Sequence, residues 1–202
     1  MSDALFEKDL GDGMTEVLRL MISFGWESDH AVQVRELALD LFDQLKDLHR
    51  LGDWERRILE AAALLHDIGF SVSEKKHHKH SYRLIRAQQL PDFTGSEVEL
   101  IANVARYHRK AHPKKKHPNL SGLSREERVV VSKLSGILRL ADGMDRSHLS
   151  SVKELQCRME GDRLFVAVRG ELEVGLDIMA GNRKRGLFEQ VYGVKVVVTR
   201  EA

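Results

Sequence analysis

The chain is poor in cysteine. Its 202 residues include one cysteine, Cys157, and ten histidines. A single thiol excludes an internal disulfide and any site built from several thiolates, such as a structural zinc or an iron-sulfur centre. A metal bound by this chain would therefore take nitrogen and oxygen ligands.

Long hydrophobic runs are also missing. No segment approaches the roughly 18 consecutive apolar residues of a membrane-spanning helix, so we expect no membrane partner. The first residues, MSDALFEKDLGDG, carry acidic side chains where a secretory signal would be positive, which favours a cytoplasmic location. A net charge of +1 with 42% apolar residues argues against disorder.

Several catalytic signatures are absent. The sequence contains no P-loop, no glycine-rich dinucleotide motif after a strand, no H-E-x-x-H zinc motif and no G-x-S-x-G elbow. Cys157 lies in a predicted strand, and we expect it to be packed rather than nucleophilic. Nucleotide-triphosphate hydrolysis of the P-loop kind and serine or cysteine hydrolysis are therefore disfavoured.

What the first 150 residues do have is helical periodicity. Apolar residues recur at the 3.6-residue spacing of an amphipathic helix. Asp29, Ser96 and Ser124 are the expected N-caps, the last two in capping boxes with Glu99 and Glu127. We predict an all-helical bundle over residues 1–150. Its helices are expected at residues 14–26, 29–45, 53–69, 81–90, 96–108 and 124–142.

The period changes from 3.6 to 2 after Ser151. Apolar residues alternate on both sides of the turn Gly161-Asp162, which predicts a hairpin, and again near residues 194–198. A helix is expected between them at 172–189. Residues 151–202 should therefore form a small α+β unit of ββαβ order that packs on the bundle, and the fold class is mainly α.

Histidine and aspartate occupy positions on the helical faces where a buried apolar residue is expected. His30 lies four residues before Val34 on one buried stripe, His66-Asp67 ends another helix, His108 ends a third and Asp142 continues a fourth. Buried carboxylates are costly unless they are paired or bound to a metal. We therefore predict one or two divalent ions, with Mn, Mg, Fe, Co, Ni and Zn all compatible with this ligand chemistry. The expected ligands are His30, His66, Asp67, His108 and Asp142.

The other histidines carry weaker signals. His77, His78 and His80 lie just before the helix expected at residue 81, where either a further ligand or a solvated loop fits. His49, His112, His117 and His148 are expected to be hydrogen-bonded in the interior or solvated.

A basic stretch follows His108. Between Leu100 and Ser124 there is no acidic residue. Such a run is either a solvated loop or a site for a phosphate-rich ligand, to which arginine offers bidentate contacts. Nucleic acid is the weaker option, because Tyr107 is the one aromatic residue of the stretch and no reading module is visible. The candidate phosphate-binding residues are Arg106, Arg109, Lys110, Lys114, Lys115 and Lys116.

The order His30, His66-Asp67, Asp142 resembles the HD-domain superfamily of metal-dependent phosphohydrolases. Longer strings resemble the C-terminal part of the exopolyphosphatase and guanosine pentaphosphatase (Ppx/GppA) family; they are ALDLFDQLKDLHRL, LEAAALLHDIG, HHKHSYRLI, VARYHRKAHPKKKHP and ILRLADGMDRS. The resemblance covers about residues 28–190 and implies an HD-type helical bundle with a C-terminal appendage.

By this resemblance, His30, His66, Asp67 and Asp142 occupy metal-ligand positions. His108, with His77 or His80, falls where binuclear members carry additional histidines. The family's exopolyphosphatase chemistry belongs to actin-like domains with glycine-rich phosphate loops, and this sequence contains neither. The resemblance therefore does not imply exopolyphosphatase activity.

The leading hypothesis is a metal-dependent phosphohydrolase acting on a phosphoester or phosphoanhydride, such as a nucleotide or polyphosphate. His66 and Asp67 are the expected catalytic residues, with Asp67 bridging two metals or orienting water. The alternative is a non-catalytic regulatory module that binds polyphosphate or (p)ppGpp. A third possibility is a structural dimerisation domain, since bundles of this size often form homodimers.

Overall fold

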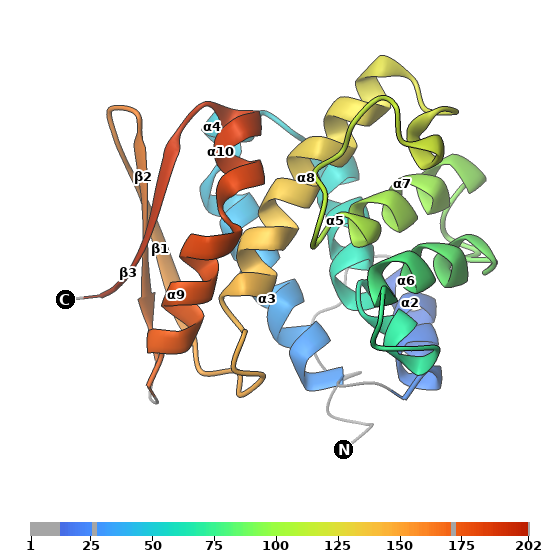
Figure 1. Ribbon diagram of the computed structural model, residues 1–202, viewed down its shortest axis with the longest axis horizontal. Helices are drawn as coiled ribbons and strands as arrows, with labels where there is room; N and C mark the ends of the chain where they lie inside the picture. The colour runs from blue at the N-terminus through green and yellow to red at the C-terminus, as the bar shows by residue number, and fades with distance from the viewer. Residues whose placement is uncertain (1–12, 26–27, 171–172, 202) are drawn as a thin grey trace.

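Helices make up most of the molecule, and a small sheet lies along one side of them (Figure 1). The computed structural model describes residues 13–25, 28–170 and 173–201. The helices are α2 (Met14–Ser23), α3 (Ser28–Gln44), α4 (Lys46–His49), α5 (Asp53–Leu65), η1 (Ile68–Ser71), α6 (His77–Arg86), α7 (Gly95–Arg106), η2 (Pro118–Leu120), α8 (Arg125–Gly143), α9 (Gly175–Lys184) and α10 (Gly186–Tyr192). The strands are β1 (Glu154–Glu160), β2 (Arg163–Arg169) and β3 (Lys195–Arg200).

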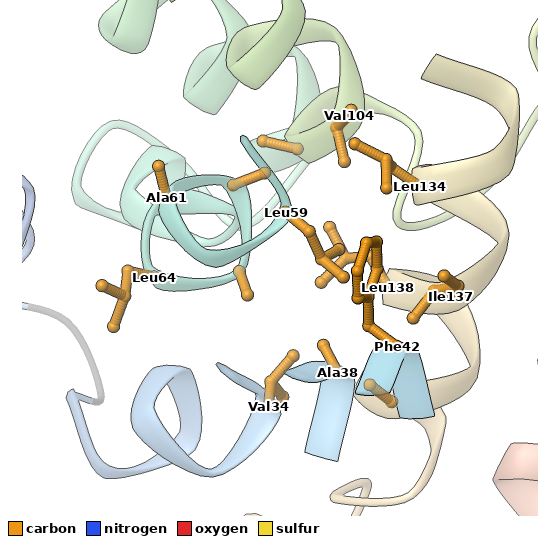
Figure 2. Close-up of a cluster of buried hydrophobic side chains, with 14 of the residues drawn as sticks. Val34, Ala38, Phe42, Leu59, Ala61, Leu64, Val104, Leu134, Ile137 and Leu138 are labelled. Atoms are coloured by element: carbon orange, nitrogen blue, oxygen red, sulfur yellow. The ribbon is translucent and has the colours of Figure 1, made fainter. Parts of the chain in front are cut away.

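Four helices, α3, α5, α7 and α8, surround the main hydrophobic core (Figure 2). Their buried side chains recur at helical spacing, so each helix turns one apolar face inward. Burial of these faces is the main favourable contribution to folding. The side chains labelled in the close-up are Val34, Ala38, Phe42, Leu59, Ala61, Leu64, Val104, Leu134, Ile137 and Leu138.

The start of α8 is confirmed, and the start of α7 is corrected. Ser124 accepts a hydrogen bond from the amide of Glu127, as the capping-box pattern predicts. In α7 the box is formed by Thr94 and Glu97 instead of Ser96 and Glu99. The two patterns overlap in sequence, and the Glu99 carboxylate is already occupied as an acceptor for Tyr82 and Asn103.

Other helix ends also differ from the sequence expectation. α5 ends at Leu65 rather than Gly69, and a 3₁₀ turn follows. α6 begins at His77 rather than Ser81. The Ser81 hydroxyl lies inside the helix, where it accepts a hydrogen bond from the amide of Gly69 and does not cap the helix. Asp29 lies inside the first turn of α3 and is not its cap. The expected helix 14–26 ends at Ser23, and residue 26 lies outside the described residues.

The C-terminal segment has the expected ββαβ order. β1 and β2 form an antiparallel hairpin, and β3 pairs parallel to β2. The helix expected at residues 172–189 is divided into α9 and α10 at Arg185, and residue 172 is outside the described range. Figure 1 shows α9 and α10 between the sheet and α8. One hydrophobic core runs from the bundle into this unit, so α9 is held against α8.

No helix within the described ranges is both long enough and apolar enough to cross a membrane.

Candidate metal centre

Six histidine and aspartate side chains converge from separate helices, each at or beside a helix end. They are His30 in the first turn of α3, His66 and Asp67 directly after α5, His77 at the start of α6, His108 just beyond α7, and Asp142 in the last turn of α8. None of them is more than 8% exposed. The helical scaffold therefore gathers imidazoles and carboxylates from five chain segments in the interior.

These side chains form two groups of three. His30, His66 and Asp142 place one ligand atom each within 4.8 Å of one another, and so do Asp67, His77 and His108. Nitrogen and oxygen ligands at such spacing suit a divalent transition ion. We refer to the two sets as group one and group two.

Asp67 belongs to group two and also faces group one. Its Oδ2 is 3.5 Å from Nε2 of His66, whereas its Oδ1 is 3.3 Å from Nε2 of His77 and 3.4 Å from Nε2 of His108. Oδ2 also lies 3.9 Å from Nε2 of His30. One carboxylate can therefore offer one oxygen to each group.

The histidine rings are oriented by contacts on their outer side. Nδ1 of His66 lies 2.7 Å from the carbonyl of Ala63, and Nδ1 of His108 lies 2.7 Å from that of Ala105. Nδ1 of His77 lies 3.2 Å from the Glu74 carbonyl. A ring that donates its Nδ1 hydrogen presents Nε2 as a free lone pair, which is how metal-binding histidines are commonly held.

His30 is oriented by a carboxylate. Its Nδ1 lies 2.7 Å from Oδ2 of Asp145, which is fully buried. The other Asp145 oxygen accepts the amide of Ser150. A carboxylate behind a histidine fixes the ring and makes its inner nitrogen more basic, as in many metal sites.

The inward atoms lack partners, and this fits a bound cation. Nε2 of His30, Nε2 of His66 and Oδ1 of Asp67 are buried without a hydrogen bond. An unpaired buried polar atom costs roughly 1–3 kcal/mol, and three in one place need a common explanation. A divalent ion in each group would coordinate all three atoms.

Charges in the centre also suit a cation. Burial opposes the charged form of His30, but the Asp142 and Asp145 carboxylates outweigh it and raise its pKa to about 10. Burial lowers the pKa of His77 to about 4 and that of His108 well below its usual value, so both rings are neutral. Burial would raise the pKa of Asp142, but Lys184 and His30 hold it well below the ordinary value.

A cavity of about 310 Å³ opens onto the centre. Asp67, His77, His108 and Asp142 are among the residues that line it. The positively charged residues among those that line it are Arg109, Lys110, Arg139, Arg146 and Lys184. Such a cavity is suited to an anion that carries phosphate groups.

Comparison with known proteins places this chain in a family. The family described as "Ppx/GppA phosphatase, domain III" matches residues 14–173, which is most of the chain. The chain belongs to the Ppx/GppA phosphatase family. The match includes all six residues of the centre.

Named relatives agree with this assignment. The chain is 31% identical over 144 residues to a guanosine-5'-triphosphate,3'-diphosphate pyrophosphatase of Vibrio vulnificus, an alignment that covers 70% of this chain and 28% of the relative. Enzymes of the same name from Aeromonas salmonicida and Aeromonas hydrophila are 34% and 36% identical over 84 and 77 residues. Those alignments cover 41% and 38% of this chain and 17% and 16% of the relatives. The chain thus spans less than a third of the length of the Ppx/GppA relatives that it matches.

In this Ppx/GppA chain, the basic residues of the 106–116 stretch do not all lie at the centre. Arg109 and Lys110 line the cavity over the centre, whereas the Arg106 guanidinium lies 5.4 Å from the Tyr82 ring and borders a different hollow. Lys114 and Lys115 line a third hollow beside α8, and Lys116 is exposed. Two of the six candidate phosphate-binding residues are therefore brought to the centre.

The three histidines before residue 81 also differ in their position relative to the centre. Of the cluster before residue 81, His77 enters group two, His78 is buried beside it, and His80 belongs to neither group. The expectation that these residues form a segment ahead of the helix is wrong, since His77 opens α6. His148, expected to be merely packed or solvated, stacks on the His30 ring with centroids 4.0 Å apart.

Sequence reasoning missed several residues around the candidate centre. Asp145 follows Asp142 by three residues, one helical turn, so a second acidic residue on that side was a usable signal. Lys184 on α9 and Arg139 on α8 reach the cavity through tertiary packing, and no local pattern marks them. Arg139 donates to the carbonyls of Tyr107 and Lys110 and so holds the segment after α7 in place.

Proposed function

We propose that this chain is a metal-dependent phosphohydrolase with a two-metal centre of the HD type. The observation that carries the proposal is the position of Asp67, which faces two groups of inward ligand atoms from opposite carboxylate oxygens. His30, His66 and Asp142 would hold one ion, His77 and His108 the other, and Asp67 would contact both. Mn, Fe, Co, Ni, Zn and Mg are the candidate ions.

Divalent ions in this ligand set would supply a water of lowered pKa and a positive charge next to a phosphoryl oxygen. The protein supplies the rest of the chemistry. His66 and Asp67 would position the ions, with Asp67 exposed to the cavity, and Arg109 and Lys110, which also line the cavity, would offset phosphate charge. Arg139 restrains the segment that carries Arg109 and Lys110, because it donates to the carbonyls of Tyr107 and Lys110.

The proposed substrate class is a phosphoester or phosphoanhydride, such as a nucleotide or a polyphosphate. Five cationic side chains around one small cavity favour a ligand with more than one phosphate charge. The names of the pyrophosphatase relatives agree with phosphoanhydride chemistry. We infer hydrolysis from the candidate metal centre, and a substrate screen would identify the leaving group.

The test is a hydrolysis screen with added Mn²⁺, Mg²⁺, Co²⁺ or Ni²⁺. The panel contains nucleotides, dinucleoside polyphosphates, cyclic nucleotides and polyphosphate, with wild type, Asp67→Asn and the exposed control Asp47→Asn side by side. We expect metal-dependent phosphate release from wild type and Asp47→Asn, and a loss of at least about a hundredfold in Asp67→Asn. No release from any substrate, or equal release from Asp67→Asn, would contradict the proposal.

A second candidate is a module that binds a polyphosphate or (p)ppGpp without hydrolysing it. A hollow of about 420 Å³ beside the centre favours it, because its lining includes five cations and no carboxylate. The cations are Lys76, Lys79, Arg106, Arg109 and Lys110.

Variants separate the two candidates. If the module is correct, Lys79→Glu with Arg106→Glu abolishes polyphosphate binding, while Asp67→Ala leaves it intact. Lys115→Glu with Lys116→Glu, which reverses two charges outside this hollow, serves as the control. Loss of binding in Asp67→Ala alone would instead favour the two-metal centre.

A further inference from the structure

Lys184 brings a positive charge of the C-terminal unit to group one. It is the last residue of α9, and its ammonium donates to Oδ2 of Asp142. The partly exposed side chain also lines the 310 Å³ cavity over the centre. A residue from outside the bundle therefore reaches both a proposed metal ligand and the space where a substrate would lie.

Close packing fixes the position of Lys184. A Cβ added to Gly143 would lie 2.9 Å from Cα of Gly181, so α8 and α9 touch through their main chains at the end of α8. Two residues before Lys184, the Asn182 side chain donates to the carbonyl of Val198 in β3 and accepts from its amide. The end of α9 is thus held on both sides, by α8 and by the sheet.

The ion pair between Lys184 and Asp142 leaves donors and acceptors unused. An ammonium has three N–H donors, and Lys184 donates to no other group within the part of the chain that the structure describes. A carboxylate has about four lone-pair positions, and Oδ1 of Asp142 lies 3.6 Å from Nε2 of His30. An ion at Oδ1 and the ammonium at Oδ2 would therefore be neighbours, and one anion can contact both.

Other cations of the cavity are placed differently. Nη1 of Arg109 lies 2.9 Å from Nε2 and 3.3 Å from Nδ1 of His77, so the guanidinium covers the face of a group-two ring. Arg139 donates both terminal nitrogens to main-chain carbonyls of the segment after α7. Among the described residues that line the cavity, Lys184 is thus the cation in contact with a group-one ligand.

The lining of the cavity carries surplus positive charge. Five cations line it against three carboxylates, which are those of Asp67, Glu74 and Asp142. Each divalent ion in the centre would add to this surplus. A phosphate group compensates such a site, because it carries negative charge on several oxygens and accepts charge-assisted hydrogen bonds from ammonium groups.

We propose that Lys184 binds a phosphoryl group of the substrate beside group one, so that the C-terminal unit forms one wall of the substrate site. This inference rests on the proposed phosphohydrolase function and assigns a substrate contact to a residue outside the bundle. Arg109 would offset phosphate charge from the side of group two.

The experiment measures binding of inorganic phosphate to the full chain by calorimetry, in saturating Mn²⁺ and again with a chelator. With Mn²⁺, we expect Lys184→Met and Lys184→Gln to bind phosphate about tenfold more weakly than wild type, in line with the loss of one charge-assisted hydrogen bond. Lys184→Arg keeps the charge and should recover most of the affinity. Elemental analysis gives the Mn²⁺ content of each variant, and circular dichroism verifies folding.

Arg183→Met is the matched control, because it removes a positive charge from the neighbouring, exposed position of α9. We expect its phosphate affinity to equal that of wild type. A loss in Arg183→Met as large as that in Lys184→Met would mean that net charge rather than contact determines the affinity, and would overturn the inference.

A purely structural ion pair predicts a different result. If Lys184 only compensates the charge of Asp142, its variants change stability or Mn²⁺ content, while phosphate affinity at full Mn²⁺ occupancy stays as in wild type; the inference is then refuted.

The proposed function and this inference fail separately. If wild type binds no Mn²⁺, the two-metal function fails, and phosphate binding that Lys184→Met still weakens in the presence of a chelator would support the anion contact alone. Absence of phosphate binding in both conditions refutes the inference, and the Mn²⁺ content then decides independently whether the two-metal centre stands.

Discussion

Side chains behind the proposed ligands hold these ligands in orientation. Asp145 contacts no inward ligand atom, yet it fixes the ring of His30 through Nδ1 and is itself held by the amide of Ser150. His148 covers the same ring from its face. The orientation of one ligand thus depends on two residues from the segment that follows α8.

Asp145→Asn tests this dependence. The amide preserves the shape but weakens the acceptor facing His30, and loss of such an outer partner typically lowers metal affinity about 10–100-fold. We expect that loss in a Mn²⁺ titration, with the fold intact by circular dichroism. Asp29→Asn, the same change on the exposed neighbour of His30, should bind Mn²⁺ as wild type does, and equal affinities in both variants would exclude the role of Asp145.

Residues of the centre that continue an apolar helical face, or directly follow one, could be anticipated from sequence, and most of the others could not. The helical period predicts which face of a helix is buried. His30 and Asp142 lie on such faces beside apolar residues, so both could be predicted as buried. His148 reaches the centre through the turn after α8, and Lys184 through the packing of the C-terminal unit. Neither position can be predicted from the hydrophobic period. His80 was an equal candidate to His77 because spacing in a short basic run does not reveal where the helix begins.

At the scale of elements, close packing between the turn after α5 and the start of α6 positions group two. A Cβ added to Gly69 would lie 2.2 Å from the carbonyl oxygen of His77 and 2.5 Å from the amide of Ser81. Both are main-chain atoms, so α6 itself would have to move. The glycine is required by this approach, since it is what allows His77 to come near Asp67.

Gly69→Ala should therefore lower the free energy of unfolding by about 1–3 kcal/mol, the usual cost of forcing atoms into a packed site. It should also weaken the binding of the second Mn²⁺, because His77 is displaced. Gly122→Ala is the matched control, since its Cβ would meet nothing within 4 Å. Urea denaturation compares the two, and the packing argument fails if they are equally stable.

Element types were predictable, while several element boundaries were not. The change of period near residue 151 predicted the hairpin and the last strand, because alternation is a direct consequence of one buried sheet face. The start of α6 was missed because its buried face is built from His77, His78 and Ser81, which a hydrophobic pattern does not report. The cap of α7 was misplaced because two capping-box patterns overlap there, and Glu99 is instead an acceptor for Tyr82 of α6 and for Asn103 one turn further along α7.

Across the whole molecule, the C-terminal unit and the bundle meet at the centre. Lys184 at the end of α9 pairs with Asp142 at the end of α8, and the Lys184 side chain is 25% exposed. Asp177, also on α9, accepts from the amide and hydroxyl of Ser147. The small α+β unit therefore supplies charge to the centre and anchors the segment that carries Asp145.

Lys184→Met should destabilise the metal-free protein more than the metal-loaded one. Without a divalent ion, the variant leaves Asp142 with less compensation, and an undercompensated buried charge costs about 1–3 kcal/mol or more. With Mn²⁺ bound, the ion offsets the same charge. Denaturation with a chelator and with Mn²⁺ measures both, with exposed Arg183→Met as the control; an equal loss in both states would contradict the argument.

The central claim is that Asp67 joins two divalent ions in one centre. Electron paramagnetic resonance of the Mn²⁺-loaded protein at low temperature, together with elemental analysis, tests it most directly. We predict two Mn²⁺ per wild-type chain with the spectrum of a spin-coupled pair, and loss of the coupling in Asp67→Asn. A spectrum of isolated Mn²⁺ at one ion per chain, or no bound metal, would contradict the claim.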